Sequence, residues 1–152
     1  MLHLIPDWRW ALAEARRVLA PGGVVLIGRG SSHRGKEGPR ADTLRRFDKL
    51  ARELGGGPRA VGTGDDSAKV AGLVALGGTA EPLEPVVWEQ QESYGQALAA
   101  VERRIYSHAW RLPDEIFETA ARRLRAEVEA AHPDLDRPQV ATHEFTLTAV
   151  RF

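Results

Sequence analysis

The sequence predicts an α/β fold that combines a central strand, several helices and a final strand. The first observation is an amphipathic helix that leads through a Pro-Gly-Gly turn into the apolar residues 24–27. The second is helical apolar spacing, which recurs between residues 43 and 131. The third is the alternation of polar and apolar side chains in residues 141–152, which is typical of a strand.

Residues 8–19 form the first predicted helix. Trp8 and Leu12 fall on one apolar stripe, Asp7 can cap the start, and the Pro-Gly-Gly turn ends the helix. The next residues, 24–27, read Val-Val-Leu-Ile and are apolar on both alternate faces. Such a segment suits a strand covered on both faces, so we expect it at the centre of a parallel sheet.

Residues 29–41 are rich in Gly and basic residues, lack apolar periodicity and predict a loop. The loop follows the carboxyl end of a predicted strand, where open α/β sheets bind their ligands. Its basic side chains could therefore contact an anionic substrate, and His33 could accept a proton near neutral pH. These candidates are Arg29, His33, Arg34, Lys36 and Arg40. A solvated loop without a binding role is the alternative interpretation.

The rest of the chain alternates helical segments with two further strands. Apolar spacing, capping residues and Gly stops predict helices at residues 43–54, 65–76, 94–106 and 114–131. Residues 86–91 follow Pro85 and predict a strand toward an edge of the sheet. Since Phe145 and Leu147 alternate with polar residues and need a neighbour, we expect residues 142–151 and this strand to form an antiparallel pair.

Residues 14–27 fit the motif E-x-x-R-V-L-x-P-G-G-x-x-x-I. The matching residues are Glu14, Arg17, Val18, Leu19, Pro21, Gly22, Gly23 and Ile27. The motif resembles the fourth helix and fifth strand of class I S-adenosylmethionine-dependent methyltransferases of the type 11 group, and residues 3–8 are similar to the segment before that helix. Residues 104–113 fit R-x-Y-S-x-x-W-x-L-P and resemble a helical cap over the substrate cavity, and the final Arg-Phe is similar to the end of the family's last strand.

For the fold, the resemblance covers almost the whole chain and implies a single domain over residues 1–152. It implies a partial Rossmann-like methyltransferase sheet that begins at a remnant of the fourth strand. An inserted helical cap would occupy about residues 93–132, and a terminal strand would run antiparallel to its neighbours.

For the site, the resemblance implies S-adenosylmethionine as cofactor and a small molecule as methyl acceptor. His3 would border the cofactor, because the turn after the fourth strand does so in the family. Tyr94, Tyr106 and Trp110 would face one substrate cavity beside the loop at residues 29–40. Packing of these aromatic side chains against the sheet, without a role in binding, is the alternative interpretation.

The family's main cofactor-binding motifs are missing from the sequence. Members hold the cofactor with a Gly-rich turn, an acidic residue for the ribose and a polar residue near the adenine, and none of these is found. We therefore expect the carboxyl-terminal half of a methyltransferase that is inactive alone and, with an unpaired strand edge, prone to self-association. The alternative is a non-catalytic α/β remnant that acts as a partner-binding or oligomerising module.

Composition excludes several other classes of function. The 21 Lys and Arg residues balance 21 Asp and Glu residues, which does not favour nucleic-acid binding. The absence of cysteine excludes disulfides and Cys-ligated metals, and the spacing of the five His residues predicts no metal site. No apolar run approaches the roughly 20 residues of a membrane span, so we expect no membrane partner and a cytoplasmic protein.

Overall fold

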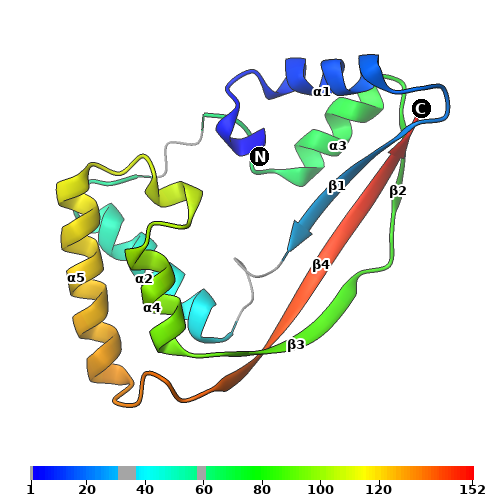
Figure 1. The fold of residues 1–152 in the computed structure, drawn as a ribbon. Coiled ribbons are helices and arrows are strands. Elements are labelled where there is room, and N and C mark those ends of the chain that lie inside the picture. Colours follow the sequence, from blue (N-terminus) through cyan, green and yellow to red (C-terminus); the bar gives the residue numbers. More distant parts are fainter. Residues whose placement is uncertain (1, 31–36, 58–60) are drawn as a thin grey trace. The chain divides into compact units, whose positions relative to one another are not determined.

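The computed structural model describes residues 2–30, 37–57 and 61–152. In chain order the elements are η1 (Leu2–Leu4), α1 (Trp8–Val18), β1 (Val24–Gly30), α2 (Pro39–Glu53), α3 (Asp66–Ala75), β2 (Thr79–Pro82), β3 (Val86–Glu92), α4 (Tyr94–Glu102), η3 (Ser107–Ala109), α5 (Asp114–Ala131) and β4 (Gln139–Arg151) (Figure 1). The described chain divides into two compact units. The first holds residues 2–30, 61–86 and 145–152, and the second holds residues 37–57 and 87–144.

The sheet is an open, antiparallel sheet of four strands among the described residues, so the predicted α/β class is confirmed. The 13-residue β4 lies between β1 and β2 and runs antiparallel to both. In the β1–β4 pair, Val24 lies opposite Arg151 at one end and Gly30 lies opposite Phe145 at the other. β3 also pairs with β4, which confirms the predicted contact between the last two strands. β2 was not predicted, because it is short and all four of its residues are exposed.

The prediction that residues 24–27 form the centre of a parallel sheet is wrong. Among the described strands, β1 pairs with β4 alone, and the long alternating β4 takes the central position instead. The side chains of Val25 and Ile27 pack on the apolar cluster of the first unit, whereas Leu26 points the other way and is 57% exposed. The apolar sequence of β1 thus predicted burial of both faces of the strand, whereas only the face with Val25 and Ile27 is covered.

The core of the first unit forms where α1 and α3 cover one face of the sheet (Figure 1). Its buried side chains are Trp8, Leu12, Leu73 and Val150. As predicted, the Asp7 side chain caps α1 by accepting a hydrogen bond from the Trp10 backbone N–H. Gly22 adopts a positive φ of 78° in the turn after α1, and its N–H donates to the Phe152 carbonyl over 2.9 Å.

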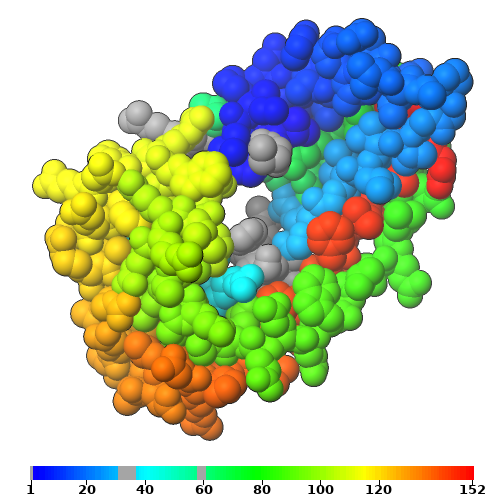
Figure 2. All heavy atoms as spheres, viewed as in Figure 1, coloured from blue at the N-terminus to red at the C-terminus, as the bar shows by residue number. Residues whose placement is uncertain are grey.

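The core of the second unit lies between α2, α4 and α5. On the outside of this unit, the side chains of α4 and α5 contact one another (Figure 2). Phe47, Leu98 and Leu124 are fully buried there. The α2 helix begins at Pro39, before its predicted start at residue 43, because Gly38 is the N-cap residue with a φ of 112°. Asp42 therefore lies in the first turn of α2 rather than capping it.

Candidate functional site

A cavity of about 120 Å³ lies inside the second unit, where the beginnings of two helices meet the end of a strand. Its lining residues come from α2, the end of β3, α4 and the segment after α4. They are Arg40, Glu92, Ser93, Gln96, Ala97, Ala100, Ile105 and Tyr106. The cavity thus combines a cation, a carboxylate and a phenol with an apolar wall.

Glu92 is the central polar residue of this cavity, although only 5% of it is exposed. Its Oε2 accepts a hydrogen bond from the Arg40 backbone N–H over 3.2 Å. Because Gly38 gives α2 no side-chain cap, this carboxylate takes over that role at the start of the helix. Directly after Glu92, Ser93 and Gln96 form a capping box that starts α4.

Two basic side chains face the other oxygen of this carboxylate. Glu92 Oε1 lies 3.1 Å from His143 Nε2 and 3.4 Å from Arg40 Nε. Within the described part of the chain, neither Glu92 Oε1 nor His143 Nε2 takes part in a directed hydrogen bond, despite their proximity. The His143 ring stacks on Trp88 with centroids 5.4 Å apart. Glu92 Oε1 therefore lies buried between the Arg40 and His143 side chains.

Tyr106, a predicted substrate-side residue, lines this cavity. Burial raises the pKa of its hydroxyl; Arg40 opposes this shift and Glu92 adds to it. The hydroxyl consequently stays protonated at neutral pH. The Tyr106 ring stacks on His108, with centroids 5.8 Å apart and planes 20° apart.

The other two predicted aromatic residues have different surroundings. The Tyr94 ring stacks on His132 at 3.6 Å, and its hydroxyl donates to Asp42 Oδ2 over 3.3 Å. Burial, with a further contribution from Asp42, raises the pKa of Tyr94. Trp110 is 58% exposed, and its indole N–H donates to the Arg104 carbonyl over 2.8 Å. Of the three side chains, Tyr106 is therefore the one that lines the cavity beside Glu92.

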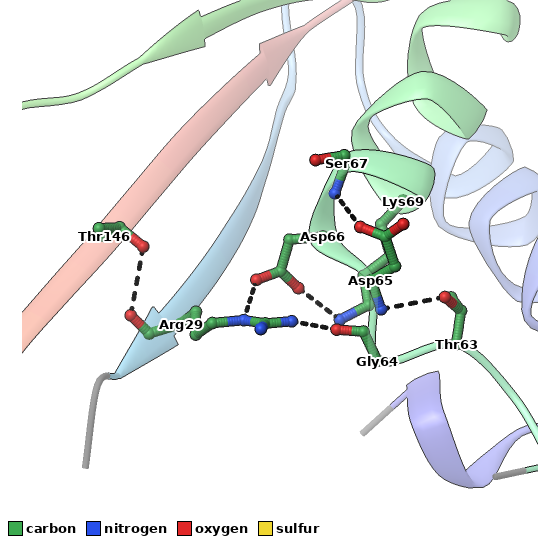
Figure 3. Close-up of polar contacts among 8 residues, drawn as sticks. All are labelled: Arg29, Thr63, Gly64, Asp65, Asp66, Ser67, Lys69 and Thr146. Atoms are coloured by element: carbon green, nitrogen blue, oxygen red, sulfur yellow. Dashed lines mark hydrogen bonds and ion pairs between the residues drawn. The ribbon is translucent and has the colours of Figure 1, made fainter. Parts of the chain in front are cut away.

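Arg29, predicted to meet an anionic substrate, instead joins β1 to the start of α3 in the first unit (Figure 3). Its guanidinium donates to the Asp66 carboxylate and to the Gly64 carbonyl. Lys69 Nζ lies 2.6 Å from the other Asp66 oxygen. Although burial favours the protonated acid, these hydrogen bonds and charges outweigh it and lower the pKa of Asp66. The charge of Arg29 is thus already compensated inside the unit.

Of the two predicted histidines, only His3 lies within the described residues. His33 falls outside the described residues. His3 lies in η1, and its backbone carbonyl accepts a hydrogen bond from the Gly62 N–H over 3.2 Å. Burial, the amino terminus and Lys69 lower the pKa of the His3 imidazole. Lys69, which lies near His3, is itself paired with Asp66, and Asp66 also accepts from Arg29. The Asp66 carboxylate is therefore not free to bind ribose hydroxyls, and these surroundings do not fit S-adenosylmethionine.

A second cavity of about 220 Å³ in the second unit contains an Asp–His pair. Asp48 Oδ1 lies 3.3 Å from His108 Nε2. Burial raises the pKa of Asp48, while His108 and Arg52 oppose the shift. The pair lies near the surface, since 53% of the Asp48 side chain is exposed.

Sequence reasoning missed Glu92 and His143, and it named Arg40 only as a loop cation. One signal was readable in each case. His143 occupies an inward position of an alternating strand, and Glu92 stands directly before a Ser N-cap. Neither pattern reveals that the two residues meet, because they are distant in sequence.

The described ranges hold neither a membrane-spanning helix nor a metal-binding cluster. There, no helix combines the length and apolar character that a bilayer span requires. In the same ranges, no three His, Asp or Glu side chains gather in a way that would ligate a metal. No protein-family model matches the chain, and no curated protein matches it significantly.

Proposed function

We propose that this chain is the acceptor-side part of an S-adenosylmethionine-dependent methyltransferase for a small molecule. It would act together with a separate cofactor-binding segment. The observation that carries the proposal is the order of α1, the Pro-Gly-Gly turn and β1, with the final strand β4 antiparallel beside β1. This order agrees with the motif in residues 14–27 and with the terminal strand that the resemblance implies.

The proposed separation of cofactor binding from acceptor binding follows from which charged groups are already paired. Near His3, the Asp66 carboxylate is paired with Arg29 and Lys69 and is not available to the cofactor ribose. The second unit, by contrast, has a partly open cavity with Arg40, Glu92 and Tyr106 among its lining residues. Since methyl transfer depends on holding the acceptor in line with the methyl group, a unit whose three helices pack around a buried core is a suitable acceptor holder.

The test is a calorimetric titration with S-adenosylhomocysteine. The chain is titrated alone and after co-expression with a segment that carries the Gly-rich turn, sought by translating the adjacent DNA. For the chain alone we expect no saturable binding tighter than about 100 µM, and for the mixture low-micromolar binding. Low-micromolar binding by the chain alone would contradict the division of the site. No binding by the mixture would reject the methyltransferase proposal.

A second candidate function, a non-catalytic partner-binding or oligomerising module, is favoured by β1. One edge of β1 has no partner among the described strands, and Leu26 exposes an apolar side chain beside it. Sedimentation velocity tests this function, with expected association at about 50 µM that Leu26→Lys weakens. Val140→Lys, at an equally exposed position of β4, is the matched control and should change nothing. A monomeric wild-type chain would exclude oligomerisation.

A further inference from the structure

The cavity of about 220 Å³ at the carboxyl-terminal end of α2 presents accessible groups of both charges. Its lining residues are Asp48, Ala51, Arg52, Gly56, His108 and Leu112. We propose that this cavity binds a free α-amino acid with a small apolar side chain, such as valine. The proposal does not depend on methyl transfer, because it concerns binding in a cavity that lies entirely within the second unit.

The ammonium group of the ligand would meet Asp48. The Oδ1 atom of Asp48 faces His108 Nε2 at 3.3 Å, whereas 53% of the Asp48 side chain is accessible and its Oδ2 has no ion-pair partner among the described residues. Burial of the rest raises the pKa of Asp48 although His108 and Arg52 oppose the shift, so these two residues do not fully compensate the carboxylate. An ammonium group at Oδ2 would add positive charge where it is lacking, and the negative end of the α2 dipole favours it as well.

The carboxylate of the ligand would meet Arg52, which is exposed and lies one turn after Asp48 on α2. Residues at this spacing can form an ion pair with each other, but Arg52 Nε instead donates to the Asp48 backbone carbonyl over 3.0 Å. Within the described part of the chain, the two terminal nitrogens of Arg52 have no partner. A guanidinium with both of these nitrogens available can bind a carboxylate through two hydrogen bonds.

The apolar side chain of the ligand would lie against the wall of the cavity. Ala51 and Leu112 form this wall and are only 4% and 8% exposed. Gly56 packs so closely on the wall that a Cβ atom there would lie 2.8 Å from Leu112 Cδ2. The volume of about 220 Å³ corresponds to about seven water molecules at roughly 30 Å³ each, which suits an amino acid of the size of valine.

The experiment is an NMR titration of the full chain at pH 7 with four probes. They are L-valine, isobutylamine, which lacks the carboxylate, isovalerate, which lacks the ammonium group, and glycine, which lacks the apolar side chain. We expect valine to bind at least fivefold more tightly than each of the other three. The largest shift changes should occur at the amides of Ala51, Arg52 and His108. Equal affinities for the four probes, or changes centred on Glu92 and Ser93, would overturn the proposal.

Variants separate the two charged contacts. Asp48→Asn should weaken valine and isobutylamine at least fivefold but leave isovalerate no weaker, because it removes the carboxylate that meets the ammonium group. Arg52→Gln should weaken valine and isovalerate and leave isobutylamine no weaker. The matched controls are Glu53→Gln and Lys49→Gln, which each remove one charge from the same helix outside the cavity and should leave all affinities within about twofold.

The same loss in Asp48→Asn and Glu53→Gln would show a general effect of charge and contradict the assignment. If a variant does not fold, the ranking of the four probes on the wild type still decides.

Discussion

The two units bury apolar side chains to very different extents. Among the described residues, the core cluster of the first unit has four buried side chains, whereas that of the second has fourteen. The first core rests on a sheet covered by α1 and α3, and the second lies between three helices. The second unit therefore has most of the hydrophobic stabilisation, and the first depends on strand pairing with β4.

The largest expected effect is in the core of the second unit. Phe47→Ala should lower the free energy of unfolding by about 4 kcal/mol, because it empties a fully buried site that packs edge-on against Phe117. Hydrogen-exchange mass spectrometry should show faster exchange in α2, α4 and α5. The amides of α1 and α3 should keep their protection.

The reciprocal change sharpens the comparison. Leu12→Ala, at a residue that is 3% exposed in the first unit, should cost about 3 kcal/mol. Its exchange effect should be confined to α1, α3 and the β1–β4 pair. If either variant accelerated exchange equally in both units, the two cores would be one cooperative structure.

An intermediate effect concerns pH, where the two units should respond with opposite signs. The pKa of Asp66 is lowered in the folded first unit by its bonds to Lys69 and Arg29, which outweigh its burial. This carboxylate therefore contributes stability above its unfolded pKa, and the contribution is lost as the pH falls through the folded pKa. Asp66→Asn should cost about 1 kcal/mol at pH 7 and less below about pH 4.

Asp48 in the second unit should behave in the opposite way. Burial raises its pKa, so its ionised form disfavours folding at neutral pH. That cost should disappear as the pH falls from the folded pKa to the ordinary Asp pKa of 3.8. Asp48→Asn should therefore be at least as stable as the wild type at pH 7, and the difference should vanish in acid. Urea unfolding between pH 3 and pH 7 measures both variants, and a loss of stability in both would remove the contrast.

The smallest effects are expected from surface ion pairs. In the second unit Arg125 meets Glu102 through two contacts, Nε–Oε1 at 2.7 Å and Nη2–Oε2 at 2.8 Å. In the first unit Arg151 meets Glu81 through one contact of 3.4 Å, and both side chains are about 60% exposed. Glu102→Gln should cost about 0.5 kcal/mol, and Glu81→Gln should cost nothing measurable in thermal unfolding. An equal cost would show that two-point geometry is irrelevant here.

Local patterns predicted the elements well, while positions in the sheet were not predictable from them. The helix with Asp7 as cap, the strand after the Pro-Gly-Gly turn and the alternating final strand all occur. The central place was assigned to residues 24–27, because an apolar run indicates burial without saying which strand lies beside it. The 13-residue β4 has partners on both sides, and only pairing across the whole chain determines this.

The candidate site was predicted less well, for a physical reason. Tyr106 was identified from a local motif, and it lines the cavity. Arg29 looked like a substrate-binding cation, but its partner Asp66 stands 37 positions away. Glu92 and His143 come from separate strands that meet only after folding. A charge can be read from a sequence, but its compensation by a distant opposite charge cannot.

The central position of β4 has a consequence for the order of folding during synthesis. Thr146 donates to the Arg29 carbonyl across 117 positions, so the β1–β4 pair closes a very long loop. As the chain leaves the ribosome, β1 has no partner until residues 145–151 have emerged, whereas α2, α4 and α5 can already pack together. A nascent chain thus exposes Leu26 and its neighbours for most of its translation, and chaperones that bind extended apolar segments should act there.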